Sequence, residues 1–104
     1  MSTYLGQNFL VDTKVKSYIA EKIRQIYEDN NLKCIIEIGP GKGAITKKIH
    51  NISNNFFVIE KDETMKDHLE GILDKEQIIF VDVLKSNIEK ELEKRNIDPK
   101  KTLV

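Results

Sequence analysis

The stretch Lys33-Cys34-Ile35-Ile36-Glu37-Ile38-Gly39-Pro40-Gly41-Lys42-Gly43 joins a short β-branched run to a glycine-rich turn. The apolar run is typical of a strand that is buried on both faces of a parallel sheet. Glycines allow the backbone to turn sharply and allow a ligand to approach main-chain N–H groups. The stretch therefore predicts a strand and a turn, with a ligand site at the carboxyl end of the strand. A tight turn that binds nothing is the alternative.

The chain on either side of this turn alternates between helical and strand patterns. The expected helices span Asp12 to about Tyr27, about residues 44–50, a segment capped by Asp62, and a segment from the capping box Ser86–Glu89 to about Arg95. The expected strands are residues 33–38, 56–60 and 78–81, with another beginning at Thr102–Val104. Asp29–Asn31 should end the first helix, and Pro99 should stop the last one. The alternation predicts βαβ units and a parallel sheet.

Composition excludes several classes of protein. The 104 residues suit one domain, and no run approaches the roughly 20 apolar residues of a membrane span. The N-terminus does not read as a signal peptide, and a single cysteine, Cys34, excludes an internal disulfide framework and a cysteine-based zinc cluster. Neither His50 nor His68 has a partner at metal-ligand spacing, so no metal site is predicted. A cytoplasmic setting is expected.

The net charge of +0 argues against a domain that holds nucleic acid by bulk electrostatics. A local basic face is still compatible with it. The candidates for an RNA-facing edge are Tyr4, Phe9, Lys14, Lys16, Lys22 and Arg24. A solvated helix face is the alternative interpretation of the same lysines.

Acidic residues stand at the ends of three successive expected strands: Glu37, Glu60 and Asp82. The spacing Gly39-x-Gly41-x-x-Ala44, with Glu60 further on, fits a dinucleotide fingerprint. It also fits S-adenosylmethionine, which has no pyrophosphate. Glu37 suits the cationic end of that methyl donor and would be poorly placed beside a pyrophosphate, so we favour the donor. Glu60 would accept hydrogen bonds from the ribose hydroxyls, and Asp82 from the adenine amino group.

Four segments together resemble the ribosomal RNA small-subunit adenine dimethyltransferases of the KsgA type. The segments are Gly6–Asp12, Glu37–Thr46, Val58–Asp62 and Val81–Leu84. The resemblance covers nearly the whole chain. It implies an α/β, Rossmann-like class I S-adenosylmethionine-dependent methyltransferase fold. It also implies methyl transfer to two adjacent adenines near the 3′ end of small-subunit rRNA, and thus a role in ribosome biogenesis on the immature small subunit.

The resemblance also implies where the methyl donor binds. Asn8, Leu10, Gly39, Glu60 and Asp82 would contact it, and Gln7, Glu37 and Gly41 would line the same pocket. The family's Gly-Asn-Leu/Ile-Pro-Tyr/Phe motif, which grips the target adenine, does not occur in this chain.

Residues 1–104 are therefore expected to be the N-terminal part of the catalytic domain, with no catalytic residue of their own. The rest of that domain and a C-terminal helical domain would lie beyond Val104, and the sheet would be truncated after three strands and the start of a fourth. The alternatives are an erythromycin-resistance-type enzyme acting on large-subunit rRNA, an NAD-dependent oxidoreductase, and a non-catalytic ribosome-assembly factor.

Overall fold

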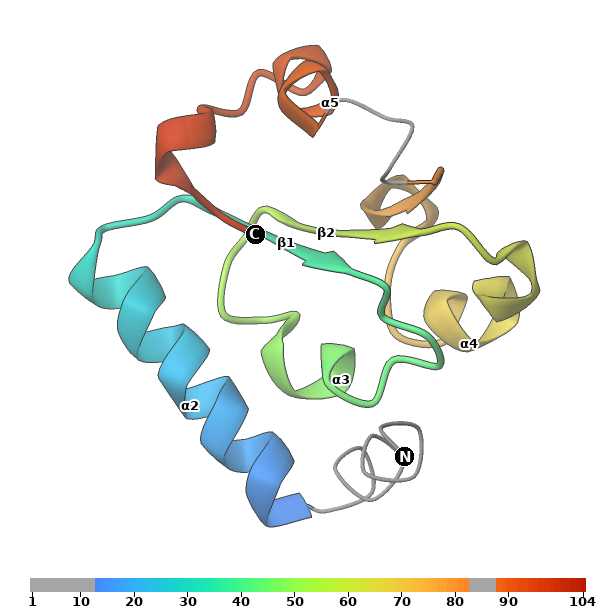
Figure 1. The fold of residues 1–104 in the computed structure, drawn as a ribbon, viewed down its shortest axis with the longest axis horizontal. Coiled ribbons are helices and arrows are strands. Elements are labelled where there is room, and N and C mark those ends of the chain that lie inside the picture. Colours follow the sequence, from blue (N-terminus) through green and yellow to red (C-terminus); the bar gives the residue numbers. More distant parts are fainter. Residues whose placement is uncertain (1–12, 83–87) are drawn as a thin grey trace.

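The computed structural model describes residues 13–82 and 88–104. Their strands form one parallel sheet in the order β3-β2-β1-β4. The strands are β1 (Cys34–Ile38), β2 (Phe56–Glu60), β3 (Ile78–Phe80) and β4 (Thr102–Leu103). This order, reversing at β1, is that of the Rossmann-like sheets, so the predicted α/β fold is confirmed, and β4 lies where a fourth strand was expected (Figure 1).

Helices cover both faces of this sheet. The α-helices are α2 (Thr13–Asp29), α3 (Thr46–Ile49), α4 (Lys66–Glu70) and α5 (Ile88–Lys94), and the 3-10 helices are η1 (Glu63–Met65), η2 (Lys75–Gln77) and η3 (Pro99–Lys101). In Figure 1, α2, α3 and α4 lie on one side of the sheet and α5 on the other. Within the described ranges no helix is long and apolar enough to cross a bilayer.

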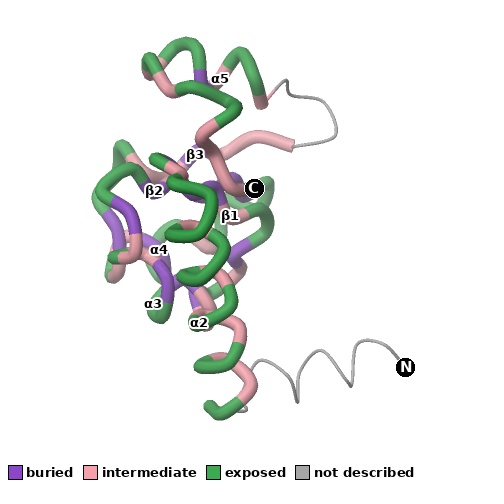
Figure 2. Tube along the Cα trace, turned by 90° about the vertical axis from the view of Figure 1, so that its left-hand side faces the viewer, coloured by how far each residue is buried: buried purple, intermediate pink, exposed green. Residues whose placement is uncertain are grey.

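Alternation along the strands divides the core into two clusters. Ile35, Phe56 and Val58 pack toward α3 and α4, whereas Cys34 and Ile59 face α5. Successive side chains of a strand point to opposite faces, so a strand covered on both sides reads as a continuous apolar run. Figure 2 shows the buried positions gathered in the strands and the short helices, while α2 has no buried residue.

Two asparagines with positive φ end the longer helices. Asn31 (φ 51°) follows α2, and Asn96 (φ 57°) follows α5. The N–H of Leu32 donates to the Tyr27 carbonyl and that of Ile97 to the Leu92 carbonyl, the bonds of a Schellman motif. The predicted break at Asp29–Asn31 is confirmed. Pro99 does not end α5, because Asn96 has already done so, and it begins η3 instead.

The helix after the glycine turn is shorter than expected. α3 covers Thr46–Ile49 where residues 44–50 were predicted, because residues 41–45 remain in turns and Gly43 adopts φ +89°. Asp62 caps as predicted: its carboxylate accepts from the N–H and hydroxyl of Thr64, and these bonds lower the pKa of Asp62. It caps the 3-10 helix η1, which leads into α4. Ser86 of the predicted capping box lies outside the described residues.

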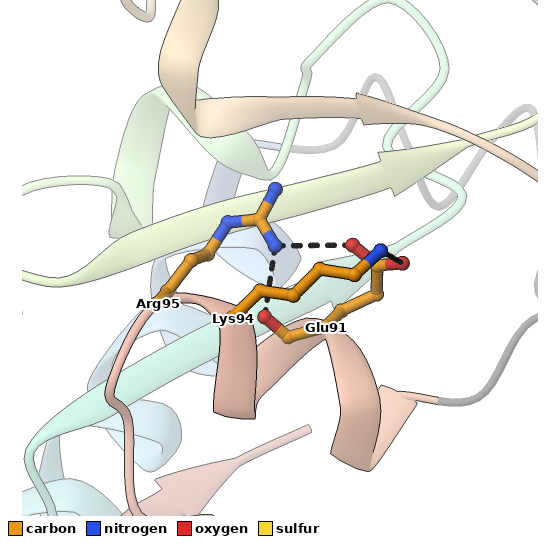
Figure 3. A network of polar contacts seen from close by, with 3 residues as sticks. All are labelled: Glu91, Lys94 and Arg95. Carbon is orange, nitrogen blue, oxygen red and sulfur yellow. Dashed lines mark hydrogen bonds and ion pairs between the residues drawn. The ribbon is translucent and has the colours of Figure 1, made fainter.

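Arg95 directly follows α5 and contacts both that helix and the sheet. Its Nη1 donates to the Glu91 carboxylate at 3.0 Å and to the Glu91 carbonyl at 2.8 Å (Figure 3). Its guanidinium carbon lies 5.5 Å from the centre of the Phe57 ring of β2. Lys94 Nζ is 3.5 Å from the other Glu91 oxygen. Arg95 first, and then Lys94, holds the pKa of Glu91 below its ordinary value.

Replacing Arg95 by methionine keeps the aliphatic stem and removes the guanidinium contacts with the Glu91 carboxylate, the Glu91 carbonyl and the Phe57 ring. We expect the free energy of unfolding to fall by about 1 kcal/mol, the sum of an i,i+4 ion pair and a cation–π contact. Lys94→Met is the matched control, because the Lys94 side chain is 69% exposed. It should change the free energy by no more than about 0.3 kcal/mol. Equal losses in urea unfolding of the two variants would contradict this account.

Candidate functional site

A cleft opens at the carboxyl ends of β1, β2 and β3. Its volume is about 220 Å³, and its walls are Ile38, Gly39, Ile59, Glu60, Lys61, Val81 and Asp82. Gly39, Glu60 and Asp82 were predicted from the sequence to share one site, and the parallel strands bring them together. Small-molecule sites usually occupy roughly 300–1,000 Å³, so the described residues line part of a nucleoside-sized site.

Glu60 is held rigidly at the end of β2. Its Oε1 accepts from the N–H of Gly41 at 3.0 Å, and its Oε2 accepts from the N–H of Asp62 at 3.0 Å. The residue is only 8% exposed. Each carboxylate oxygen has a second lone pair, so Glu60 can still accept hydrogen bonds from a ligand that enters the cleft. The two backbone bonds fix where those acceptors point.

The glycine turn leaves open space next to the cleft. Gly39 (φ +68°) and Gly41 (φ +58°) have backbone conformations that favour glycine, and a Cβ on either would meet nothing within 4 Å. Gly39 lines the cleft, whereas Gly41 contributes through the N–H that it donates to Glu60. The open space permits a ligand to approach the main chain closely.

Glu37 lies apart from the other two acids. Its Oε1 accepts from the buried Thr46 hydroxyl at 2.5 Å, so the bond joins β1 to α3 across the glycine turn. Glu37 lines a neighbouring apolar groove between α2, α3, β1 and β4, with Ile23 and Ile49. Burial raises the pKa of Glu37, and the hydrogen bond from Thr46 acts in the opposite direction. The structure thus gives Glu37 a contact with α3, and it does not place Glu37 in the cleft wall.

Because the pKa of Glu37 is raised, the substitution Glu37→Gln is expected to stabilise the fold by an amount that depends on pH. Because the folded state binds the proton more tightly than the unfolded state, the contribution of Glu37 to stability falls as pH rises from the ordinary value of 4.5 through the raised folded pKa. Glutamine still accepts from Thr46 but carries no charge to desolvate. We expect the variant to be more stable than the parent at neutral pH, with the difference shrinking toward pH 4.

Chemical denaturation between pH 4 and pH 8 checks this expectation. The exposed Glu76 of η2 offers the control variant Glu76→Gln, which should show no such trend. A Glu37→Gln variant that is less stable at neutral pH would contradict the expectation.

Other predicted positions have different outcomes. Gln7, Asn8 and Leu10 lie outside the described residues. Ile38, Ile59, Lys61 and Val81 line the cleft but were not predicted. The sequence did offer one signal for these four residues, because each is next to a predicted residue at the end of a strand. In the structure, the 42% exposure of the apolar Ile38 also marks it as a residue that lines an open cleft. Thr46 was also missed, because only the tertiary fold places it beside Glu37.

Cys34 has the environment of a core residue. It is fully buried in β1, and burial raises the pKa of its thiol. A thiol of this kind is a poor nucleophile. Among residues 13–82 and 88–104, no three histidine, cysteine or acidic side chains gather where they could hold a metal ion.

Comparison with known families explains this combination of glycine turn and acidic strand ends. The family model for ribosomal RNA adenine dimethylase matches residues 1–104. The chain belongs to this family. It is 40% identical over 90 residues to ribosomal RNA small subunit methyltransferase A of Mycoplasma pneumoniae, covering 85% of this chain and 33% of that protein. The proteins of the same name from Wigglesworthia glossinidia brevipalpis (40% over 89 residues, 83% and 33%) and Buchnera aphidicola (41% over 83 residues, 80% and 30%) are similar.

Membership confirms the resemblance that the four sequence segments indicated. The chain spans about a third of the length of the curated relatives that it matches.

Proposed function

We propose that this chain provides a methyl-donor site of an rRNA adenine dimethyltransferase. The whole enzyme would transfer methyl groups from S-adenosylmethionine to the exocyclic amines of two adjacent adenines near the 3′ end of small-subunit rRNA, during biogenesis of the subunit in the cytoplasm. The observation that carries the proposal is the Glu60 carboxylate, which two backbone N–H groups fix beside an open glycine turn in a member of this family.

The residues present fit the donor. Glu60 would accept from both ribose hydroxyls with its remaining lone pairs, and Asp82, on the next strand end, from the adenine amino group. Gly39 leaves room for the donor against the main chain. Glu37 would act through the turn that Thr46 ties to it, and Gly41 through its bond to Glu60. Asn8, Leu10 and Gln7 are proposed to complete the pocket.

Catalysis in this proposal comes mainly from positioning the reactants. When bound, the donor would supply a methyl group activated by its sulfonium sulfur. The adenine amino nitrogen would attack in line, the S–CH3 bond would break to release S-adenosylhomocysteine, and the nitrogen would lose a proton to solvent. The residues that orient the adenine belong to a motif absent from this sequence, and we propose that they lie in the remainder of the longer enzyme. This chain alone is then expected to bind the donor without methylating rRNA.

Calorimetry with S-adenosylmethionine and with NAD tests the donor site. Preferential binding of S-adenosylmethionine is expected, and preferential binding of NAD would overturn the proposal in favour of an oxidoreductase. Rapid methylation of immature small subunits by residues 1–104 alone would contradict the proposal that this chain binds the donor but does not orient the adenine.

The target subunit is tested separately with the intact enzyme and labelled methyl groups. The matched relatives are named for the small subunit, which favours that target. Labelling of large-subunit rRNA would instead indicate the resistance-type activity. Binding of the small subunit without any affinity for the donor would indicate an assembly factor.

A further inference from the structure

An exposed stripe of two lysines and a tyrosine runs along the first half of α2. Lys14, Tyr18 and Lys22 are spaced four residues apart, so they lie on one face of the helix, and all three are exposed. Tyr18 retains 64% of its surface in contact with solvent, which is unusual for so large a ring. The ammonium of Lys22 lies 5.5 Å from the centre of that ring. We call these three residues the α2 stripe.

The charges of α2 are arranged against the helix dipole. Its first turn contains no acidic residue and its last turn no basic one, while Lys14 and Lys16 lie near the start and Glu28 and Asp29 at the end. The dipole favours the opposite arrangement, by about 0.3–1 kcal/mol for each charge near a terminus. The helix dipole therefore does not account for the lysines at this end, where their positive charge can attract a negatively charged group.

The α2 stripe lies toward the same edge of the sheet as the cleft. Ile23 and Ile26 of α2 line a groove with Ile38, the last residue of β1, while the C-terminal end of α2 joins the start of β1 through residues 30–33. The helix thus runs roughly antiparallel to β1, with its first half at the far end from the junction between the two elements. Figure 1 shows this end of α2 pointing away from its junction with β1.

We propose that the α2 stripe binds single-stranded RNA. The Tyr18 ring would stack on one unpaired base, and Lys14 and Lys22 would contact the flanking phosphates. The inference rests on the proposed function and deepens it by naming a surface that holds the substrate strand. Stacking on an aromatic ring needs an unpaired base, so the surface should prefer single strands to a duplex.

RNA fits this surface better than an acidic protein does. An aromatic ring next to a cation offers a flat face together with a positive charge, the combination that single-strand binders use. Because the net charge of the chain is zero and lysines are concentrated at the α2 stripe, the attraction of RNA phosphates is expected mainly at this stripe.

Fluorescence anisotropy with a labelled single-stranded RNA of about 12 nucleotides, and with the same RNA as a duplex, tests the proposal. Tyr18→Ala should weaken single-strand binding about tenfold, the loss of one stacked base. Tyr18→Phe keeps the ring and should bind like the parent. Lys22→Ala should lower the slope of log affinity against log salt by about 0.7, as one lost phosphate contact on a single strand does.

Lys75→Ala is the matched control, because Lys75 is an exposed lysine of η2, just before the amino end of β3. It should leave the salt slope unchanged. Circular dichroism and calorimetry with S-adenosylmethionine accompany each variant, so that a folding defect or a failed donor site is distinguished from a lost RNA contact.

Results of three kinds, concerning RNA affinity, strandedness and the type of partner, would overturn the inference. The first is RNA affinity that Tyr18→Ala and Lys22→Ala leave unchanged, or no measurable RNA affinity of a chain that still binds the donor. The second is tighter binding of the duplex than of the single strand. The third is tighter binding to phosphatidylserine vesicles than to RNA with the same dependence on Tyr18, which would assign the stripe to a membrane surface.

Discussion

Replacing Glu60 by glutamine is expected to lower the affinity of this chain for S-adenosylmethionine at least tenfold. Hydrogen bonds to a charged acceptor are worth about 1.5–3 kcal/mol, and each 1.4 kcal/mol is a factor of ten in affinity. The substitution removes the charge. It also gives the side chain one acceptor oxygen where the N–H groups of Gly41 and Asp62 now use two.

The free energy of unfolding should fall in the same variant, by about 1–3 kcal/mol, because one backbone N–H is left facing an amide NH₂ group in a nearly buried site. Calorimetry measures the affinity and urea denaturation the stability. Glu63→Gln is the matched control: Glu63 is an exposed acid three residues further along the chain, and both properties should stay at the parent's values. A Glu60→Gln variant with the parent's donor affinity would exclude Glu60 from the site.

Gly43→Ala should be the most destabilising substitution in the glycine turn. A Cβ at this position would lie 2.5 Å from Ile72 Cδ1 and 3.6 Å from Leu69 Cδ2, and the φ of +89° is one that side chains rarely adopt. Overpacking costs about 1–3 kcal/mol, and an unfavourable positive φ about 1–2 kcal/mol. Rotation of Ile72 can relieve part of the overlap, so we expect a loss of about 2–4 kcal/mol in urea or thermal unfolding.

Gly41→Ala separates the two causes. Gly41 also has a positive φ, +58°, but a Cβ there would meet nothing within 4 Å. Only the conformational cost should remain, about 1–2 kcal/mol. Should Gly41→Ala prove as destabilising as Gly43→Ala, the close packing of the turn against α4 and the residues after it would not be the cause.

These two positions illustrate how similar residues in the sequence acquire different roles. Gly41 and Gly43 are separated by one residue, and both fit a ligand-binding turn. In the fold, Gly41 faces open space and donates to Glu60, whereas Gly43 is buried against Ile72. The spacing of glycines predicts the turn, but the neighbours of each glycine come from residues 60–72.

The strands were predictable because their signal is local. Residues 56–60 coincide with β2, and the strands near 34 and 78 differ from prediction by one residue at an end. A run of β-branched and aromatic residues bounded by polar ones has few alternatives when both faces are to be buried. The short helix α3 was harder, since its length depends on how residues 41–45 turn and not on periodicity.

The site residues also show what local sequence predicts and what packing decides. Glu60, Asp82 and Gly39 were predicted to meet because parallel strands end at one edge, and the cleft contains all three. Glu37 satisfied the same rule, but its side chain points to Thr46, since alternation along β1 turns it toward the face covered by α3. An acid at a strand end is thus predictable from sequence, while the face it occupies follows from register and packing.

The sequence by itself determined the strands, the glycine turn and the family, because each is recognised from residues close together in the chain. The alternation of strands and helices then implied a parallel sheet. Only the tertiary structure decided that Glu60 is fixed by the N–H groups of Gly41 and Asp62, that Glu37 accepts from Thr46 of α3, and that Tyr18 remains exposed on α2. The first two features depend on contacts between different elements of the fold, and the third depends on which face of α2 packs against the rest of the protein. Local pattern carries no information about either.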